Sequence, residues 1–588
     1  MARSPLFLKA LGARLTRPGD RLRNRVRASR AKLGAKPRVA ETLPEPTFLG
    51  DVDRGERLVA GSWPALEGLV VEVGTGSIWD APLRSGTVAN RLEGARQTGD
   101  WLDDLAALGT KAARQRAQSW TWDWIRHYGA GSGPGWRPDW AGARAMRWTA
   151  HSEMLTHGVE QSGVDRFWRA LAAHRRYLTL AWDEAPEGLP RLRALAGLVW
   201  IGRVLPSRED ADAAELLGAL AGDYVGPEGA VPSRAPEDLA EAVILLTWTA
   251  RILESGGAKA SAEHLAAIAR AVPVIRALRF ADGRLARFHG GGPGVPERLD
   301  LALAELRLAT REKPRLPMGF ARLAGGRLAL AMDAAPPPSE GEGALTAHAA
   351  TLAFEMTVGR QPFVVNAGPG EVFGRDWAHL CRQTAAQSTV EVDGQSSARI
   401  EGRDFAARTF GERLESGPTL VSVRQAQDAT GMWLLATQDG YVATHGLLHE
   451  RRIFVEAAGR EARGEEILSV TDARARARFD RAAARGPVAF AVRFHLHPTI
   501  RAELDTYRGQ VALAFPSGEA WVFRAGGGVI ELEDSIYFDR AAARPAATKQ
   551  VVVRARVVEY LGQVTWSFGR TAEAPRASDP LAWGPEGV

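Results

Sequence analysis

The chain has 588 residues, of which 45% are hydrophobic and 24% are charged. This length predicts two or three domains, and the composition is that of a folded globular protein, which excludes wholesale disorder. The single cysteine, Cys381, excludes an internal disulfide, and no apolar run reaches the roughly 18 residues that a membrane-spanning helix needs.

Positive charge is concentrated at the N-terminus, where residues 1–40 hold twelve Lys and Arg residues and one acid, Asp20. Because this segment sums to +11 and the whole chain to +6, residues 41–588 sum to −5. We therefore expect no nucleic-acid partner. The only apolar stretch here, Leu6 to Leu8, is too short for a secretory signal. We interpret residues 1–45 as a solvated basic arm, with weak contact to an anionic membrane surface as the alternative.

The next part of the chain, residues 46–315, is predicted to be a helical domain. In one segment Leu239, Val243 and Leu246 recur at helical spacing, and Pro236 stands where the first turn of a helix tolerates proline. Residues 188–205 and 261–280 repeat the pattern. Tandem helical hairpins of this kind build a bundle or a closed toroid, and periodicity does not choose between them.

Tryptophan is concentrated in the same half, with thirteen of the 18 Trp residues before residue 250. A flat aromatic ring can stack on the apolar face of a sugar, so these residues are candidates for a glycan cleft. Packing within the helical domain, with the indole N–H satisfied at the edge of the core, is the other interpretation.

A Pro/Gly-rich break at 334–343 lies near a change to alternating β-type runs, including 327–332, 351–358, 488–494 and 551–558. Short polar turns separate these runs, which is typical of an antiparallel sandwich. Residues 316–588 are therefore predicted to form an all-β domain that follows the helical one.

Histidines of the β half are the first candidate site residues. On a strand, His348 would share a face with Leu352 and Phe354, either as a core histidine or as a site residue. His445 and His449 would share one face of a strand, about 13 Å apart, which is too far to bind one metal ion. His495 and His497 either converge on one ion or are polar residues beside a strand end.

Polar residues of the helical half are less specific. His151 is expected on a helix, Tyr177 lies in a polar cluster with His174, and the Arg234 guanidinium in a loop could grip a carboxylate with two hydrogen bonds. The sequence shows no phosphate-binding glycine loop, no Cys/His zinc framework and no serine-hydrolase elbow.

Several segments together resemble the heparinase II/III-like polysaccharide lyases over about residues 50–570. They are Trp101 to Leu105, Trp120 to Ile125, Pro134 to Trp136, His348 to Gly370 and Thr384 to Val390. The resemblance implies an α/α toroid followed by an antiparallel β-sandwich, with a glycan cleft between them. It also implies β-elimination at a uronic acid, in which Tyr or His moves protons while Asn, Gln, Arg or His holds the carboxylate.

The sequence departs from the family pattern at several of these positions. Of a His-x-His-x-Asp signature only His348 remains, Asn366 stands for an Asp, Gln387 stands for a His, and Val231 stands for a His of the helical half. Because zinc prefers His, Cys or carboxylate ligands, we predict no metal and no cofactor. The catalytic candidates that remain are Tyr177, Tyr441, His348, His445 and His151, with Tyr177 or Tyr441 as the proton carrier, and Tyr224 is a further candidate without an assigned role. The substrate-binding candidates are Arg234, Asn366, Gln387 and His449.

Three functions stay open at this point. The first is a lyase acting on an anionic, uronate-containing polysaccharide or oligosaccharide, and the second is a catalytically impaired protein of the cell envelope that binds glycan. The third is a hydrolase with paired carboxylates, for which Asp123 or Asp183 are candidates. The family resemblance favours the periplasm or cell envelope, whereas the lack of a clear export signal leaves a cytoplasmic location as the alternative.

Overall fold

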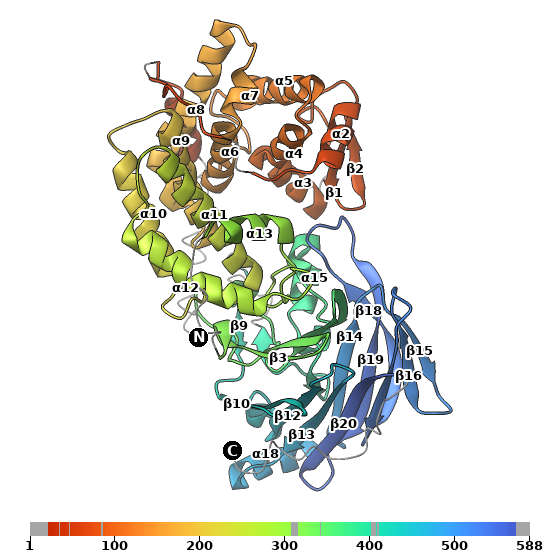
Figure 1. Cartoon of the computed structure of the whole chain (residues 1–588). Coiled ribbons are helices and arrows are strands. Elements are labelled where there is room, and N and C mark those ends of the chain that lie inside the picture. The colour runs from red at the N-terminus through yellow and green to blue at the C-terminus, as the bar shows by residue number, and fades with distance from the viewer. Residues whose placement is uncertain are drawn as a thin grey trace.

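A computed structural model describes residues 22–34, 36–45, 48–83, 86–306, 315–341, 343–400, 407 and 411–571. Helices dominate the first half and antiparallel sheets the second, and the two parts pack against each other (Figure 1). The predicted order, an α/α toroid followed by a β-sandwich, is confirmed. Within the described ranges, no helix is both long and apolar enough to cross a membrane.

The helical domain is built from antiparallel hairpins that follow an arc in Figure 1. A small hairpin of β1 (Ser62–Leu66) and β2 (Leu69–Glu72) lies near its start. Its helices are α2 (Val52–Ala60), α3 (Thr87–Thr98), α4 (Asp100–Leu108), α5 (Lys111–Tyr128), α6 (Pro138–Ala150), α7 (Ser152–Thr156), α8 (Gln161–Ala181), α9 (Leu189–Val204), α10 (Asp210–Tyr224), α11 (Pro236–Ser255), α12 (Ala262–Leu278) and α13 (Pro296–Glu305).

Two glycines set the closest helix contact of this domain. A Cβ on Gly197 of α9 would lie 2.4 Å from Gly142 Cα of α6, and a Cβ on Gly142 would lie 2.3 Å from the Arg193 carbonyl oxygen. The two helix backbones therefore touch, and any larger residue at either position would force them apart. Around this contact, apolar residues at helical spacing, such as Leu239, Val243 and Leu246 of α11, form the core as the sequence predicts.

The tryptophans of α5 and the turn that follows it are packing residues. Trp120, Trp124 and Trp136 are buried, and their indole N–H groups donate to the Gly76 carbonyl, the Gln97 side chain and the Tyr128 carbonyl. Trp124 also meets Trp148 edge-on, with ring centroids 5.2 Å apart. The packing interpretation is confirmed for these three residues, which offer no open face to a sugar.

Part of the basic N-terminal segment is bound to the helical domain. Residues 22–31 are helical. The Asn24 amide donates to the Trp136 carbonyl at 2.7 Å, and Lys36 pairs with Asp165 at 2.8 Å. The prediction of a solvated arm is therefore wrong for this part, because the arm supplies hydrogen-bond partners to the core. Residues 1–21, for which membrane contact was the alternative, lie outside the described residues.

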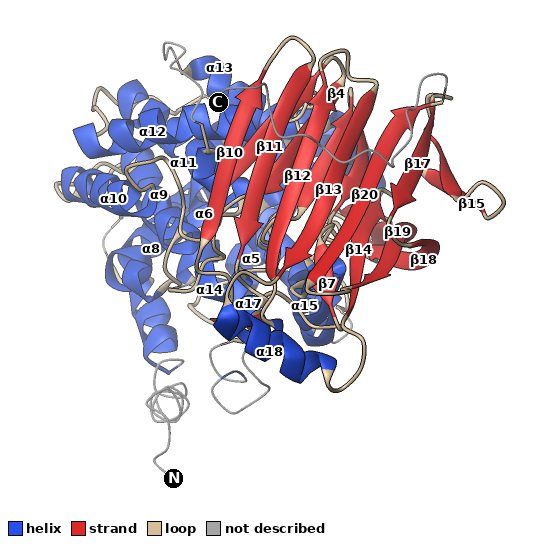
Figure 2. Ribbon diagram, turned by 90° about the horizontal axis from the view of Figure 1, so that it is seen from below, coloured by secondary structure: helices blue, strands red, loops and turns tan. Residues whose placement is uncertain are grey.

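Two large antiparallel sheets pack face to face in the second half (Figure 2). The first sheet has the order β10-β11-β12-β13-β20-β17-β16-β15, and the second has the order β18-β19-β14-β6-β5-β4-β3, with β7 also paired to β14. The strands are β3 (Phe320–Gly325), β4 (Leu328–Asp333), β5 (Phe354–Val358), β6 (Gln361–Val365), β7 (Val390–Val392), β10 (Val421–Gln427), β11 (Gly431–Gln438), β12 (Leu448–Glu456), β13 (Glu461–Ser469), β14 (Ala489–Leu496), β15 (Arg501–Asp505), β16 (Gln510–Ala514), β17 (Ala520–Gly526), β18 (Val529–Tyr537), β19 (Ala546–Arg556) and β20 (Leu561–Arg570).

Smaller elements join these strands. A two-stranded hairpin pairs β8 (Arg399–Ile400) with β9 (Leu414–Ser416). The helices are α14 (Gly343–Thr346), α15 (Arg375–Cys381), α17 (Val442–His445) and α18 (Ala473–Ala483). Figure 2 shows α17 and α18 together at one end of the sandwich.

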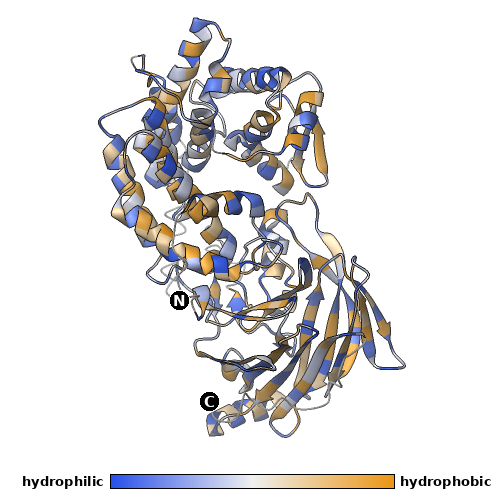
Figure 3. Ribbon diagram, viewed as in Figure 1, coloured by the Kyte–Doolittle hydropathy of each residue, from blue (hydrophilic) through white to orange (hydrophobic). Residues whose placement is uncertain are grey.

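Aromatic side chains fill the space between the two sheets. Phe354 of β5 stacks on Trp566 of β20, with ring centroids 5.7 Å apart, and Phe494 of β14 meets both Trp566 and Phe568 edge-on. Apolar residues alternate with polar ones along the strands, as the colouring of Figure 3 shows. This period-2 pattern gives each sheet one buried face.

An ion pair lies in the middle of this apolar core. Arg451 of β12 and Glu466 of β13 face each other in register, and Arg451 Nε lies 2.8 Å from Glu466 Oε1 with both side chains fully buried. The same carboxylate accepts hydrogen bonds from His449 Nε2 at 2.8 Å and from the Trp566 indole at 2.9 Å. Arg451 also donates to the carbonyls of Leu352 and Ser388, which belong to loops of the opposite sheet. One guanidinium group therefore links the two sheets by hydrogen bonds, within the apolar core that packs them together.

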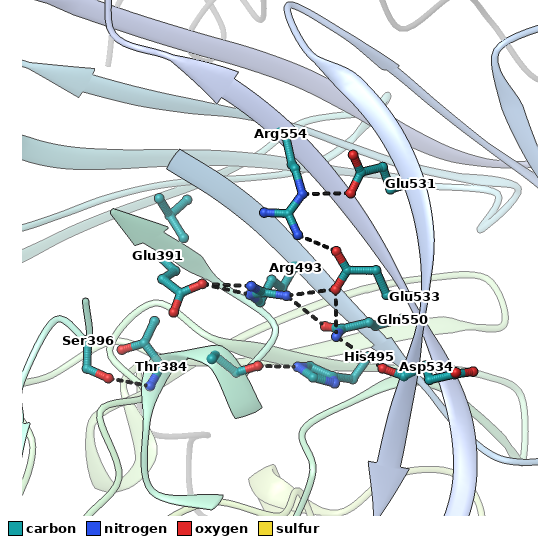
Figure 4. Close-up of polar contacts among 12 residues, drawn as sticks. Thr384, Glu391, Ser396, Arg493, His495, Glu531, Glu533, Asp534, Gln550 and Arg554 are labelled. Atoms are coloured by element: carbon teal, nitrogen blue, oxygen red, sulfur yellow. Dashed lines mark hydrogen bonds and ion pairs between the residues drawn. The ribbon is translucent and has the colours of Figure 1, made fainter. Parts of the chain in front are cut away.

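A second polar network lies on the second sheet (Figure 4). Arg493 of β14 pairs with Glu391 of β7 at 2.8 Å and with Glu533 of β18 at 3.3 Å, and Glu533 also pairs with Arg554 of β19. The side chain of Arg554 is 48% exposed. The outer members of this network are therefore screened by solvent, unlike Arg451 and Glu466.

These two pairs predict losses of stability of different size on mutation. Glu466→Gln leaves the Arg451 charge buried without a counter-charge, so we expect the sandwich to lose about 3–5 kcal/mol of unfolding free energy. The exposed control Arg554→Gln should cost about 1 kcal/mol or less. Urea unfolding followed by tryptophan fluorescence measures both, and equal losses would contradict the central role of the buried pair.

Candidate functional site

A cleft of about 870 Å³ lies where the helical domain meets the β-sandwich. Its walls come from the starts of α9 and α11, the end of α10, the loop around α14 and Arg540 of the sandwich. This is the place that the family resemblance predicts for a glycan. The ionisable residues that line it are Glu187, Asp223, Glu237, Asp238 and Glu241 on the acidic side, and Arg191, Arg193 and Arg540 on the basic side.

Each arginine of the cleft already has a carboxylate partner in the protein. Arg193 lies 3.3 Å from Glu241, and Arg540 lies 3.5 Å from Glu237 and 2.5 Å from Glu371. Arg191 lies 3.9 Å from Glu187. The cleft therefore has an excess of negative charge and no uncommitted guanidinium group among its described lining residues. Such a surface repels a polyanion.

The carboxylates at the start of α11 are held in different environments. Glu237 accepts the Gly292 N–H at 2.7 Å, and burial raises the pKa of Glu237. Burial would also raise the pKa of Glu241, but the charges of Arg298 and Arg193 outweigh it and hold that pKa below its ordinary value. These acids were not among the sequence candidates, because Glu and Asp after Pro236 are what the first turn of any helix favours.

Tyr224, at the end of α10, is the tyrosine that lines the cleft among its described residues. Burial, together with the negative charge of Asp238, raises the pKa of Tyr224. A tyrosine that abstracts a proton needs the opposite shift, because it has to reach the tyrosinate form near neutral pH. Tyr224 thus lies in the cleft, but its raised pKa disfavours the tyrosinate that would take up a proton during elimination.

His348 lines a second cavity of about 630 Å³, between α3 and the loops of the sandwich. It is 4% exposed, and its backbone N–H donates to His289 Nδ1 at 3.2 Å. Burial lowers the pKa of His348 well below its usual value, and the charge of His289 lowers it further. The expectation that His348 lies on a strand is wrong, because β5 begins only at Phe354 and His348 belongs to the preceding loop.

The three residues at the positions of the family's metal signature are engaged with one another and with the backbone. His348 Nδ1 lies 3.4 Å from Gln387 Nε2, which also donates to the Cys381 carbonyl at 2.6 Å, and Asn366 Oδ1 accepts the Ser388 N–H at 2.9 Å. This donor set does not fit zinc, because two amides replace anionic or imidazole ligands. Among the described residues, no cluster of three or more His, Cys, Asp or Glu side chains could hold a metal ion.

Arg234 does grip a carboxylate, but it is one of the protein's own. Its guanidinium lies 2.5 Å from Asp333 Oδ1 at the end of β4, and it donates to the carbonyls of Met318, Gly319 and Pro336 at 2.8–3.2 Å. Asp333 is fully buried, and its other oxygen lies 3.1 Å from His289 Nε2. Arg234 therefore fastens the helical domain to the first β-hairpin of the sandwich. His289, which the sequence candidates did not include, completes this cluster from a Gly-rich loop.

The candidates of the helical core lie away from the cleft. The Tyr177 hydroxyl donates to Asn24 Oδ1 at 2.7 Å and contacts the Trp136 carbonyl at 2.8 Å, and burial raises the Tyr177 pKa. His151 caps the end of α6 and lies 2.9 Å from the buried carboxylate of Asp103. Neither residue lines the cleft.

The candidates from the stretch 441–449 are also separated from the cleft. Tyr441 is 1% exposed and its hydroxyl donates to the Val390 carbonyl, while His449 is fully buried beside Glu466. The expectation that His445 and His449 share one face of a strand is wrong, because His445 ends α17 and Gly446 turns the chain before β12 begins. His445 instead lines a surface pocket at the far end of the sandwich.

His495 and His497 do not converge on a common site. His495 Nδ1 contacts Ser535 Oγ at 2.7 Å and its Nε2 contacts the Ala385 carbonyl at 3.0 Å (Figure 4), whereas His497 contacts Thr499. Burial and the charge of Arg493 lower the pKa of His495 to about 4. His495 is thus a neutral structural residue.

Comparison with known proteins agrees with this architecture. A family model described as heparinase II/III-like, C-terminal, matches residues 310–567. The chain is 31% identical over 552 residues to FtsZ-localized protein C of Caulobacter vibrioides, and the match covers 90% of this chain and 92% of that protein.

Solved structures with the same fold include a heparinase III, at a TM-score of 0.67 and 10% identity over 92% of this chain and 88% of that one. The heparan sulfate lyase HepC of Pedobacter heparinus has a TM-score of 0.53 and 11% identity over 94% of this chain and 88% of that one. At such identities the likeness concerns the fold alone. The fold and the interdomain cleft thus define a polysaccharide-lyase-like protein. The chain belongs to the heparinase II/III-like family, as the sequence resemblance indicates.

The Arg234 cluster predicts a stability effect that a conserved charge does not rescue. Arg234→Lys keeps the charge beside Asp333 but loses the contacts to three carbonyls, so we expect a loss of about 2–4 kcal/mol. Arg193→Lys, at a half-exposed pair, should cost about 1 kcal/mol or less. Scanning calorimetry of the whole chain measures both, and equal shifts would contradict a clamp at Arg234.

The low pKa of His495 predicts a pH-dependent stability. Between about pH 6.5 and pH 4 the unfolded chain binds a proton at this residue that the folded chain does not, so stability is full above this window and falls as the pH decreases through it. We expect His495→Gln to flatten that fall by up to about 3 kcal/mol. Ser535→Ala, which keeps the imidazole, should lower stability without flattening the slope. A slope unchanged in His495→Gln would refute the assignment.

Proposed function

We propose that this protein keeps the polysaccharide-lyase fold without lyase chemistry and acts at the division site as a protein that is localised with FtsZ. The first half of the proposal rests on one observation: the arginines of the cleft form ion pairs with carboxylates of the same chain. Arg191, Arg193 and Arg540 of the cleft pair with the protein's own carboxylates, and Arg234, outside the cleft lining, pairs with Asp333. No guanidinium described at the cleft is left to hold the carboxylate of a uronic acid.

Proton transfer is equally unsupported by the cleft residues. β-Elimination needs a base near neutral pKa next to the acidic carbon, and an acid near the leaving oxygen. The raised pKa of Tyr224 disfavours the tyrosinate form that a base would need, and Tyr224 is the one tyrosine of the described cleft lining. His348, whose pKa is lowered by burial, lies in a different cavity and donates its backbone N–H to His289.

The second half of the proposal rests on the curated relative. FtsZ-localized protein C is 31% identical over nine-tenths of this chain, whereas the lyases of known structure share only 10–13%. A shared role with the more similar relative is the more economical inference. The chain then supplies a rigid two-domain body whose outer surfaces, and not its cleft, make the functional contacts.

The alternative is a lyase that acts on a uronate-containing polysaccharide of the cell envelope. The lyase fold and the 870 Å³ cleft with Tyr224 in its wall favour it. In this alternative Tyr224 moves the proton, and Glu237, whose pKa is raised by burial, protonates the leaving oxygen.

Activity assays separate the two proposals. We expect no gain in the absorbance of unsaturated uronate when the purified chain is incubated with heparin, heparan sulfate, alginate or hyaluronan, with a heparinase III as the active control. Turnover that is lost in both Tyr224→Phe and Glu237→Gln would overturn the non-catalytic proposal and support the lyase.

Localisation tests the other half independently. A fluorescent fusion at the native locus should form a band at midcell that disappears when FtsZ is depleted, and the purified chain should sediment with FtsZ polymers but not with FtsZ kept unassembled. A uniform distribution that ignores FtsZ depletion would refute the role, whatever the lyase assays show.

A further inference from the structure

The pocket beside α17 and α18 has the opposite electrostatic character to the cleft. It has a volume of about 780 Å³ and is lined by Arg478, Arg481 and Arg485, with Asp393 as its only carboxylate among the described lining residues. Three guanidinium groups against one carboxylate leave an excess of two positive charges. This excess stands out, because residues 41–588 as a whole sum to −5.

The three arginines share one face of the chain. Spacings of three and four residues place Arg478, Arg481 and Arg485 on the same side of α18 and its continuation. The adjacent side of the helix is apolar, with Ala475 and Phe479 buried. Because its apolar side is used for packing, α18 cannot turn over, and its charged side has to face the pocket and solvent.

These guanidinium groups are not used for internal ion pairs. Across the parts of the chain that the structure describes, no carboxylate pairs with Arg478, Arg481 or Arg485 within 4.0 Å. Arg481 Nε donates to the Ala477 carbonyl of its own helix at 3.1 Å. In the interdomain cleft, by contrast, every arginine has a carboxylate partner. The donors of this pocket are therefore available to an external anion.

The floor of the pocket is rigid and polar. Gly446 has a φ of 67°, and a Cβ on it would lie 2.0 Å from the Ala475 carbonyl oxygen, so the backbones of α17 and α18 touch. Above this contact, His445 is 3% exposed, with Nδ1 2.9 Å from Thr444 Oγ1 and Nε2 3.3 Å from Asp393 Oδ2. Thr444 and His445 thus give the pocket a hydrogen-bonding floor at a fixed place.

We propose that the α17–α18 pocket is a binding site for a phosphomonoester group. A phosphomonoester carries a charge of about −1.5 to −2 at neutral pH and three acceptor oxygens, which matches the excess charge and the three guanidinium donors. A single carboxylate would leave the charge excess half compensated. The site is independent of the proposed function, because it shares no residue with the cleft and involves no reaction.

The group could belong to a soluble phosphomonoester or to a lipid headgroup, and the experiment has an arm for each. Isothermal titration of the whole chain with inorganic phosphate measures the soluble form. Flotation with phosphatidylcholine vesicles that contain phosphatidic acid, compared with vesicles that contain phosphatidylglycerol, measures the lipid form, because only phosphatidic acid carries a phosphomonoester.

Matched variants decide whether the pocket is the site. Arg478→Gln and Arg481→Gln should each weaken binding about tenfold or more, since each removes a hydrogen bond between charged partners. Arg474→Gln is the control, because it removes the same charge from the same helix but does not line the pocket. It should change the affinity by less than about twofold.

Several outcomes would overturn the assignment. Binding weakened equally by Arg474→Gln would mean attraction to overall charge, with no site. No saturable binding of inorganic phosphate or phosphatidic acid by the wild-type chain would also refute it. So would binding of an oligoglutamate peptide that depends on Arg478 and Arg481 while phosphate fails to bind, because the pocket would then recognise acidic protein.

Discussion

The sandwich depends on one ion pair in its apolar core, where the desolvation of charged groups costs the most free energy. Arg451 and Glu466 are fully buried, and desolvation of the two charges costs several kcal/mol each, which their mutual attraction and further hydrogen bonds offset. His449 and Trp566 complete the carboxylate side, while the guanidinium reaches across to Ser388 in the opposite sheet. Because Ser388 is next to Gln387 and leads into β7, this contact also fixes the loops around His348. The pair thus links the two sheets and reaches the loop that carries Gln387.

The cleft also contains arginines that are paired with carboxylates of the same chain. A lyase that uses arginine to hold the substrate carboxylate needs that guanidinium free in the resting protein. Here Glu241 and Glu237 satisfy Arg193 and Arg540, and Asp333 satisfies Arg234. These interactions stabilise the contact between the two domains. In this chain, these arginines contribute to the architecture, and the non-catalytic proposal rests on this observation.

The sequence predicts the architecture well, because helical periodicity in 237–250 and period-2 alternation in 488–494 are local properties of the chain. It predicts the site poorly, because burial and partnership are set by contacts between distant residues. His449 looks like a polar strand residue until the register with β13 places Glu466 beside it. His289 carries no local signal, since only the fold brings its Gly-rich loop to Asp333. Arg234 was predicted to hold a ligand carboxylate with two hydrogen bonds, which stays a prediction, and in the structure its guanidinium contacts one oxygen of Asp333 and three backbone carbonyls.

The contacts of the Arg234 side chain also hold its backbone in an unfavourable conformation. Its φ of 52° lies in the left-handed region, where a residue with a Cβ costs about 1–3 kcal/mol unless its surroundings enforce it. The four interactions of its guanidinium do enforce it, so the turn and the clamp exist together or not at all. Partial loosening would release the enforcing contacts while the turn relaxes, and each event would favour the other. At this point of the joint between the two halves of the molecule, the same side-chain contacts therefore fasten the domains and hold a strained backbone in place.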